Sequence, residues 1–158
     1  MKRFIIAFCT LIAVGALASP AFGAVNFRSD PTCQDVGTQV QCSGGRISGL
    51  GNEAFFIDID ATGIASVECT NPGGNVAPGQ DTEVDASGSF GPFTADKNGN
   101  FRFPTLTTAA PANPSGAEAC PNPQWSAAIT DVAFNTPATI SIIQGGEVVA
   151  TTEVAIAP

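Results

Sequence analysis

Short runs of alternating apolar and polar residues, separated by glycine and proline, constrain the fold of this chain most strongly. In residues 55–60 the odd positions are Phe or Ile, and two of the three even positions are Asp. The same alternation returns in residues 64–69, 83–90 and 101–103. A period of two places alternate side chains on opposite faces of a β-strand, so that one face is buried. No stretch shows helical periodicity over three turns, and the pattern therefore predicts an all-β fold.

The firmest local prediction is a hairpin near the C-terminus. Residues 139–144 and 147–156 are rich in β-branched residues, and Gly145-Gly146 joins them. Two residues that adopt positive φ readily, placed between two such runs, predict a tight turn. Asn98-Gly99 suggests a second hairpin. Eight or nine short strands of this kind fit an immunoglobulin-like, two-sheet antiparallel β-sandwich, and a small barrel is the alternative.

The first 23 residues are typical of a secretory signal peptide, and we expect them not to be part of the folded domain. Lys2 and Arg3 precede an apolar run over residues 4–18, and Ala21-Phe22-Gly23 supplies a small-x-small cleavage pattern. The run is shorter than the roughly 20 residues that a membrane-spanning helix needs, and a retained anchor is the alternative. We expect a secreted or periplasmic protein with one β-sandwich domain, residues 24–158, and no membrane span after cleavage.

Four cysteines remain after cleavage, since Cys9 lies in the signal peptide. An even number in an oxidising compartment predicts disulfides, and three pairings are possible in principle. We favour Cys33–Cys42, because the eight intervening residues fit a local hairpin. Cys69 and Cys120 then pair with each other, and both begin a C-x-N-P sequence. A zinc site is the alternative, but the chain has no C-x₂-C pair and no histidine.

The charge and the missing residue types exclude several functions. Cleavage removes two of the six basic residues and none of the 14 acidic ones, which leaves a formal charge of −10. Such an acidic protein is a poor partner for nucleic acid. The absence of histidine excludes Ser-His-Asp sites, and the absence of tyrosine excludes a phenolic acid or base. A pair of carboxylates could cleave glycosidic bonds, but the acids fall mainly at outward strand positions, so we expect no enzyme and no catalytic residues.

Two acidic pairs are candidate ligands for Ca²⁺. Asp58 and Asp60 share one face of a predicted strand, as do Glu83 and Asp85. Residues i and i+2 of a strand lie about 7 Å apart, so that two such pairs on neighbouring strands could hold the ion. The alternative is a solvated outer face. The segment 96–100 (DKNGN) departs from the calcium-loop pattern and is interpreted as an Asn-Gly turn.

Two aromatic residues are candidates for contact with a ligand. Phe56 falls at an outward position on the same strand face as the polar Asp58 and Asp60, and an exposed Phe there would mark an interface. Trp125, the one tryptophan, could stack on a sugar, but core packing is the more ordinary role for a Trp close to a bridged cysteine.

Three motifs resemble those of a group of small exported microbial β-sandwich proteins. They are Ser-Gly-Leu-Gly-Asn at residues 48–52, Cys-Thr-Asn-Pro-Gly-Gly-Asn at residues 69–75 and Cys-Pro-Asn-Pro-Gln-Trp at residues 120–125. The likeness covers most of residues 24–158. It implies export and the fold, and it implies no catalytic or binding residue.

The sequence therefore predicts a secreted, non-catalytic module for adhesion, matrix or ligand binding, with an unknown extracellular protein or glycan as its partner. One alternative is a calcium-stabilised binding module that uses the two acidic pairs. Another is an inhibitor that presents residues 71–80, a loop rich in Pro and Gly, to a secreted hydrolase.

Overall fold

The computed structural model describes residues 24–158, and the predicted signal peptide, residues 1–23, lies outside the described residues. Thirteen strands and one four-residue helix, α1 (Gly116–Ala119), form this part of the chain. The strands are β1 (Asn26–Ser29), β2 (Thr32–Asp35), β3 (Val40–Ser43), β4 (Arg46–Ser48), β5 (Phe55–Thr70), β6 (Val76–Pro78), β7 (Thr82–Phe93), β8 (Phe101–Arg102), β9 (Leu106–Thr107), β10 (Ser126–Phe134), β11 (Ala138–Gln144), β12 (Glu147–Val154) and β13 (Ile156–Ala157).

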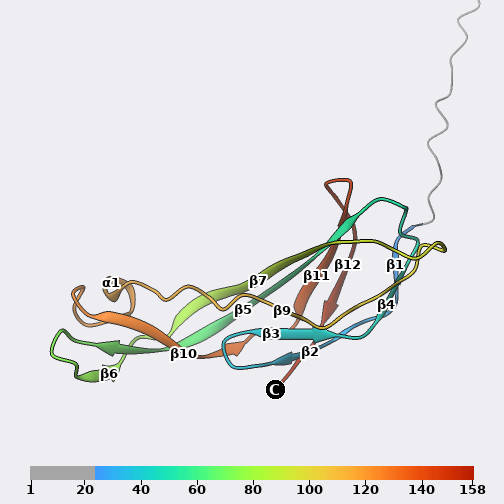
Figure 1. Ribbon diagram of the computed structural model, residues 1–158. Helices are drawn as coiled ribbons and strands as arrows, with labels where there is room; N and C mark the ends of the chain where they lie inside the picture. The colour runs from blue at the N-terminus through green and yellow to red at the C-terminus, as the bar shows by residue number, and fades with distance from the viewer. Residues whose placement is uncertain (1–23) are drawn as a thin grey trace, which may run out of the picture.

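The larger, six-stranded sheet is built around β5, which has 16 residues. On one side of β5, β11 pairs with its first half and β10 with its second half. On the other side, β7 pairs with residues 55–65 and β6 with residues 68–70. β12 continues the sheet beyond β11. The molecule is therefore elongated, with α1, β6 and β10 at one end and β1, β4 and the β11–β12 turn at the other (Figure 1).

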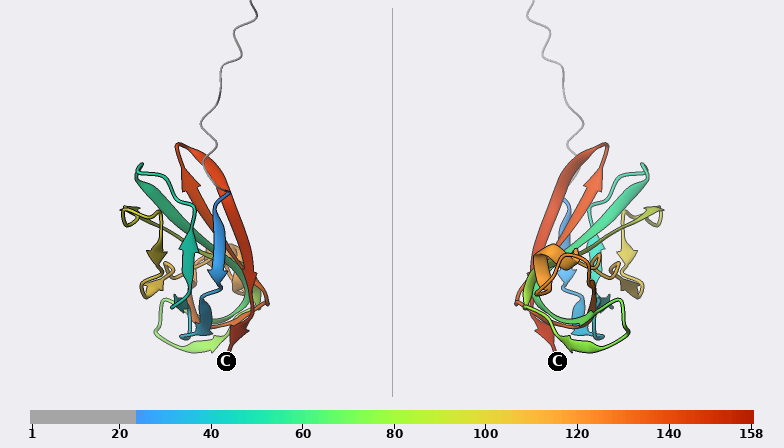
Figure 2. Two further views of the ribbon diagram at one scale, coloured as in Figure 1. Left: turned by 90° about the vertical axis from the view of Figure 1, so that its right-hand side faces the viewer. Right: turned by 90° about the vertical axis from the view of Figure 1, so that its left-hand side faces the viewer.

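Two smaller sheets form the second layer, in the orders β1-β4-β8 and β13-β2-β3-β9. The same stretches of chain run through both sheets, because β1 leads directly into β2, β3 into β4, and β8 into β9. The chain bends between the two sheets. At one bend Gly45 has φ +80°, and a Cβ on it would lie 2.7 Å from the nitrogen of Pro31. Both ends of the resulting sandwich are visible in Figure 2.

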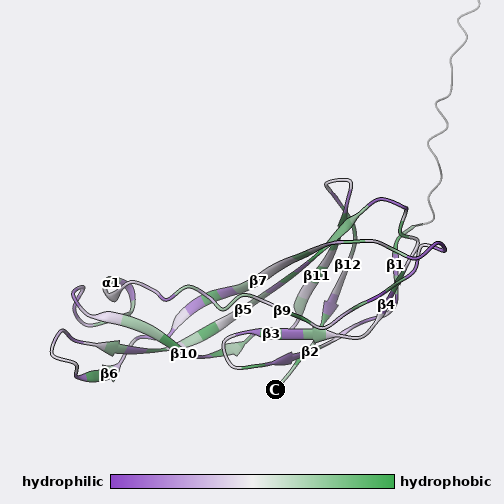
Figure 3. Ribbon diagram, viewed as in Figure 1, coloured by the Kyte–Doolittle hydropathy of each residue, from purple (hydrophilic) through white to green (hydrophobic). Residues whose placement is uncertain are grey.

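Apolar residues lie along β5 towards both ends of the molecule (Figure 3), but they belong to two separate cores. Fifteen buried residues from both layers form the larger core, among them Phe55, Ile57 and Ile59 of β5. Five buried residues form the smaller core, and they are Ala65, Val67, Cys69, Ala119 and Val132. The alternation in the sequence thus predicts correctly that the odd positions of β5 are buried.

Both predicted disulfides are confirmed. Cys33 and Cys42 are register partners on β2 and β3, with 4.1 Å between their Cα atoms. Cys69 at the end of β5 is bonded to Cys120, which directly follows α1, with 5.8 Å between Cα atoms. Cys33 and Cys42 lie in the larger core and Cys69 lies in the smaller one.

The all-β sandwich is confirmed, with antiparallel pairing throughout except between β13 and β2, which are parallel. The C-terminal hairpin is confirmed as well. β11 and β12 meet at Gly145 and Gly146, whose φ angles are +62° and +82°. The immunoglobulin-like topology is not confirmed. The hairpin predicted at Asn98-Gly99 is wrong, because β7 pairs with β5 whereas β8 pairs with β4. The Asn-Gly turn carries the chain from one layer to the other.

Candidate functional site

The predicted acidic pairs lie on neighbouring strands of the large sheet, on its outer face. Asp58 and Asp60 point away from the core on β5, and Glu83 and Asp85 do so on β7. The register offsets the two pairs along the strands: Asp60 faces Ser87, and Asp85 faces Thr62. The structure therefore brings Asp58, Asp60 and Asp85 into one region and places Glu83 further along the sheet.

The electrostatics of this region show crowding among carboxylates. Partial burial raises the pKa of Asp60, and the neighbouring charges of Asp58 and Asp85 raise it further. One carboxylate oxygen of Asp58, Oδ1, is buried and has no hydrogen-bond partner. In residues 24–158, however, no three acidic, His or Cys side chains lie together in a way that could hold a metal ion. Calcium binding at Asp58, Asp60, Glu83 and Asp85 thus stays a prediction.

Phe56 is 41% exposed on the same outer face, as its position in the alternation predicts. Its register partner on β11 is Ile143, which in turn faces Val148 on β12. Val148 is 62% exposed. An apolar row, consisting of Phe56, Ile143 and Val148, therefore crosses three adjacent strands next to the acidic residues. Trp125, by contrast, packs half-buried against the smaller core.

Sequence reasoning missed the cluster of arginines on the opposite layer. Arg28 is on β1, Arg46 on β4 and Arg102 on β8, the three strands of the smallest sheet. Arg46 and Arg102 are direct register partners, and Arg46 faces Ser29, which follows Arg28. Lys97, the fourth basic residue of residues 24–158, lies in the loop that precedes β8. All the basic residues of the described chain are thus on or beside one small sheet.

The alternation of β1, β4 and β8 directs the arginines outward. Phe27, Ile47 and Phe101 face the larger core, so that Arg46 and Arg102, their neighbours on β4 and β8, lie on the other face of the sheet. All three arginine side chains are exposed. Nε of Arg28 donates a hydrogen bond of 2.8 Å to Oγ of Ser48. Among residues 24–158, no carboxylate forms a hydrogen bond with any of these guanidinium groups.

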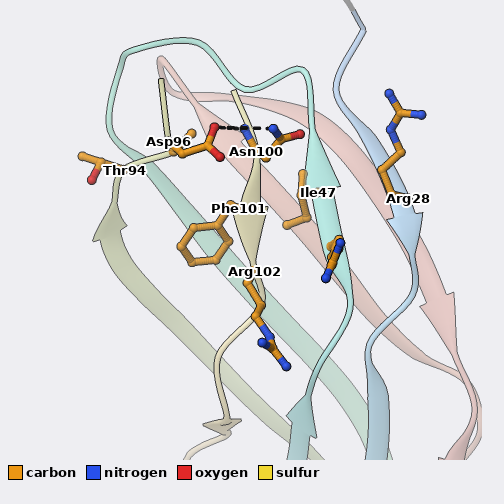
Figure 4. A pocket seen from close by; sticks show the side chains of 9 residues that line it. Arg28, Ile47, Thr94, Asp96, Asn100, Phe101 and Arg102 are labelled. Atoms are coloured by element: carbon orange, nitrogen blue, oxygen red, sulfur yellow. Dashed lines mark hydrogen bonds between the residues drawn. The ribbon is translucent and has the colours of Figure 1, made fainter. Parts of the chain in front are cut away.

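The arginines line a cavity of about 930 Å³. Figure 4 shows Arg28 and Arg102 on either side of the strand that carries Ile47, with Thr94, Asp96 and Asn100 along the rim. Arginine side chains from three strands thus line one hollow, and their three positive charges outnumber the single carboxylate of Asp96 there.

Asp96 lies at this cavity but its carboxylate is occupied within its own loop. Oδ1 of Asp96 accepts hydrogen bonds from the backbone N–H groups of Asn98 and Asn100, at 2.8 and 2.9 Å. These bonds from Asn100 and Asn98 are the main cause that lowers the pKa of Asp96. The same five-residue loop occurs at Asn71, whose Oδ1 accepts the corresponding bonds from Gly73 and Asn75. The loop is therefore a recurrent structural element of this fold, and within residues 24–158 no hydrogen bond joins Asp96 to an arginine.

Cross-strand pairing of like charges is unfavourable, and opposite-charge pairs are worth about 0.2–1 kcal/mol. The small sheet pairs Arg46 with Arg102 and has Arg28 beside them. An anion between the guanidinium groups would therefore reduce their repulsion and stabilise the sheet. Local sequence patterns contain no sign of this cluster, because the three residues are far apart in the chain. The one available signal is that all the basic residues fall outside the strands that carry the acids.

No family model, curated protein or solved structure matches this chain. Within the part of the chain that the structure describes, no helix has both the length and the apolar character needed to cross a membrane.

Proposed function

We propose that this protein is an exported, non-catalytic binding module that holds an anionic group of an extracellular partner between Arg28, Arg46 and Arg102. The observation that carries this proposal is the register pairing of Arg46 with Arg102 in a chain with 14 acidic residues. A charge arrangement that weakens the free protein is favourable once a ligand of opposite charge is bound.

The chemistry of arginine suits this role. Guanidinium groups present planar forks of N–H donors that match the oxygens of carboxylate, sulfate and phosphate groups. The cavity of about 930 Å³ is as large as those that hold small ligands, which are roughly 300–1,000 Å³. Asn100 and Thr94 add neutral polar groups at its rim. The site therefore offers charge, forked donors and room for a ligand of several heavy atoms.

Export and the lack of catalysis rest on separate support. Two disulfides are typical of proteins that fold in an oxidising compartment. The chain has no histidine and no tyrosine, and its four cysteines after the signal peptide are all bonded. Few groups remain that could act as a nucleophile or as a general base near neutral pH.

The arginine side chains themselves provide the test. Residues 24–158 contain three arginines, so that a ¹⁵N NMR spectrum shows three Nε–Hε signals, one for each residue of the cluster. Citrate serves as the probe, because it carries several carboxylates on a small framework. We expect all three signals to shift together with a single dissociation constant. Arg46→Gln should weaken binding about tenfold or more, the loss expected for one charged hydrogen bond.

Lys97→Gln is the matched control, because it removes one positive charge near the cluster without removing a group that lines the cavity. It should leave the citrate affinity within about twofold, as expected for a screened surface charge. Arginine signals that do not move with citrate would show that the proposal is wrong. An equal loss of affinity in Lys97→Gln and Arg46→Gln would show general charge attraction in place of a site.

A further inference from the structure

The arginines and the acidic residues are separated between the three-stranded and the six-stranded sheet, and the one other charged strand residue of the described chain, Asp35 of β2, lies in the four-stranded sheet. The three-stranded sheet contains three arginines and no acidic residue. The six-stranded sheet contains no Lys or Arg, and it carries eight acidic residues. They are Asp58, Asp60, Glu68, Glu83, Asp85, Asp131, Glu147 and Glu153.

The two charged surfaces face in opposite directions. Phe101 of β8 contacts Phe55 of β5 edge to face, with 4.9 Å between ring centroids, and it lies 5.2 Å from Phe93 of β7. Successive side chains of a strand point to opposite faces. Arg102 therefore points away from β5, and Phe56 points away from β8. The sandwich thus has an arginine face (Arg28, Arg46 and Arg102) on one side and an acidic face (Asp58, Asp60 and Asp85) on the other.

We propose that the arginine face of one molecule docks onto the acidic face of the next, so that the protein assembles head to tail. This inference rests on the proposed function, because it takes the carboxylates of a second copy as the anionic ligand of the arginines. Charge complementarity between the two faces of the same chain is the observation that identifies the occupant.

The acidic face has the features of a surface that needs a cationic partner. Oδ1 of Asp58 is buried without a hydrogen-bond donor, and an unpaired buried oxygen of this kind costs about 1–3 kcal/mol. No basic residue of the large sheet relieves the repulsion among Asp58, Asp60 and Asp85. A guanidinium group that approaches this face supplies the missing positive charge, and it reaches Oδ1 of Asp58 only if that side chain turns outward.

The spacing of the charges on the two faces is compatible. Arg46 and Arg102 are paired on neighbouring strands, whose separation is about 4.8 Å. Asp58 and Asp60 alternate on one strand and are therefore about 7 Å apart. The long, flexible arginine side chains span this difference. The apolar row of Phe56, Ile143 and Val148 lies beside these acids and adds a surface from which contact removes water.

The geometry favours open chains over closed dimers. The two faces are different surfaces of the molecule, so that each contact leaves one free face of each kind at the ends. The formal charge of −10 makes whole molecules repel one another, although at physiological salt this repulsion is screened beyond about 8 Å. Association is therefore expected to be reversible and to increase with protein concentration.

Sedimentation velocity of residues 24–158 at physiological salt tests the proposal. The wild-type sedimentation coefficient should rise with concentration. Arg46→Gln/Arg102→Gln removes most of the arginine face, and Asp58→Asn/Asp60→Asn removes most of the acidic face. Each double variant alone should remain a monomer. Their equimolar mixture should form dimers and nothing larger, because each partner keeps one intact face of opposite kind.

Two single variants that each remove one charge outside both faces, Lys97→Gln and Asp81→Asn, are the controls. Both proteins should associate as the wild type does. A wild type that stays monomeric while citrate still shifts the arginine signals would overturn head-to-tail assembly and leave the anion site intact. Association that persists in either double variant would also overturn it. Binding of soluble polygalacturonate by a monomeric wild type would assign the arginine face to an acidic glycan and reject the second copy.

Discussion

The two halves of β5 lie in parts of the molecule that are stabilised in different ways. Residues 55–61 lie over the larger core, where both layers of the sandwich contribute buried side chains. Residues 63–70 lie over the smaller core, which has five buried residues and is covered on one side by α1. The part of the molecule around residues 55–61, called the near part below, is a two-layer sandwich. The part around residues 63–70, called the far part, is an extension of one sheet.

This difference explains the placement of the second disulfide. A small core contributes little burial free energy, since burial amounts to about 25 cal/mol per Å² of apolar surface. Small structural units with insufficient cores are commonly held by disulfides. Cys69–Cys120 fixes the segment that contains α1 to the end of β5, and it is itself part of the smaller core. In the far part a covalent bond thus takes over the role that the opposite layer has in the near part.

Removal of each disulfide should have the largest effect and should separate the two parts. Cys69 and Cys120 are 51 residues apart, and Cys33 and Cys42 are nine apart. On the chain-entropy model the two bonds stabilise the fold by about 4 and about 3 kcal/mol respectively. In Cys69→Ser/Cys120→Ser we expect amide hydrogen exchange to accelerate at Val67 and Ala127 far more than at Ile57.

Cys33→Ser/Cys42→Ser is the matched variant for this measurement. Because both cysteines lie in the larger core, loss of the Cys33–Cys42 bond should accelerate amide hydrogen exchange in the near part at least as much as in the far part. Equal acceleration in both parts for both variants would mean that the molecule unfolds as one cooperative unit, and the comparison between the two parts would then fail.

Gly63 lies on β5 at the junction of the two parts, and its replacement should have an intermediate effect. A Cβ at this position would lie 2.6 Å from Cγ1 of Val132 and 2.8 Å from the carbonyl oxygen of Ala133 on β10. The φ of Gly63 is not positive, so that the effect is steric. Overpacking of this kind costs about 1–3 kcal/mol, and we expect Gly63→Ala to lower the free energy of unfolding by that amount in urea titrations.

The double variant Gly63→Ala/Val132→Ala shows whether the contact is the cause. Val132→Ala removes one of the two close atoms, so the cost of Gly63→Ala should be smaller in that background. An unchanged cost would place its origin elsewhere. A Gly63→Ala protein as stable as the wild type would mean that β10 does not approach β5 as closely as the structure shows.

The sequence predicts the strands better than it predicts their connections. The alternation in residues 55–60 and 64–69 identifies the buried face correctly, but it divides one strand into two runs at Gly63. That glycine reflects the close approach of β10, a contact between segments about 70 residues apart, and no local pattern contains it. The hairpin wrongly predicted at Asn98-Gly99 fails for a similar reason: the turn is correct, but the partner strands are chosen by the layers.

The candidate site shows the same limit. The outward positions of Phe56, Asp58 and Asp60 follow directly from the period of two. The arginine cluster does not, because it depends on the register of β4 between β1 and β8. Register is set by the burial pattern of whole strands and by turn geometry, and strands of two to four residues contain too little pattern to specify it.

Neutralising Asp60 should give the smallest effect. Asp60 and Asp85 line a small hollow close to the junction of the two parts, on the outer face of the large sheet. The pKa of Asp60 is raised in the folded protein, first by partial burial and then by Asp58 and Asp85. The folded state therefore binds protons more readily than the unfolded state, and the stability contribution of this group increases as the pH falls through its folded pKa. At pH 7 the ionised Asp60 is unfavourable, so Asp60→Asn should stabilise the protein.

We expect a gain of about 0.5 kcal/mol or less, because Asp60 is largely exposed and solvent screens its charge. In thermal unfolding this corresponds to a rise of about 2 °C at pH 7, and the rise should disappear at pH 3, where the wild-type carboxyl group is protonated. A variant less stable than the wild type at pH 7 would contradict the repulsion.

The same pair of proteins in CaCl₂ and in chelator tests the calcium hypothesis. A midpoint that Ca²⁺ raises in the wild type and not in Asp60→Asn would support a calcium-stabilised module, whereas a midpoint that Ca²⁺ leaves unchanged would reject it and leave the acidic face free for a cationic protein surface.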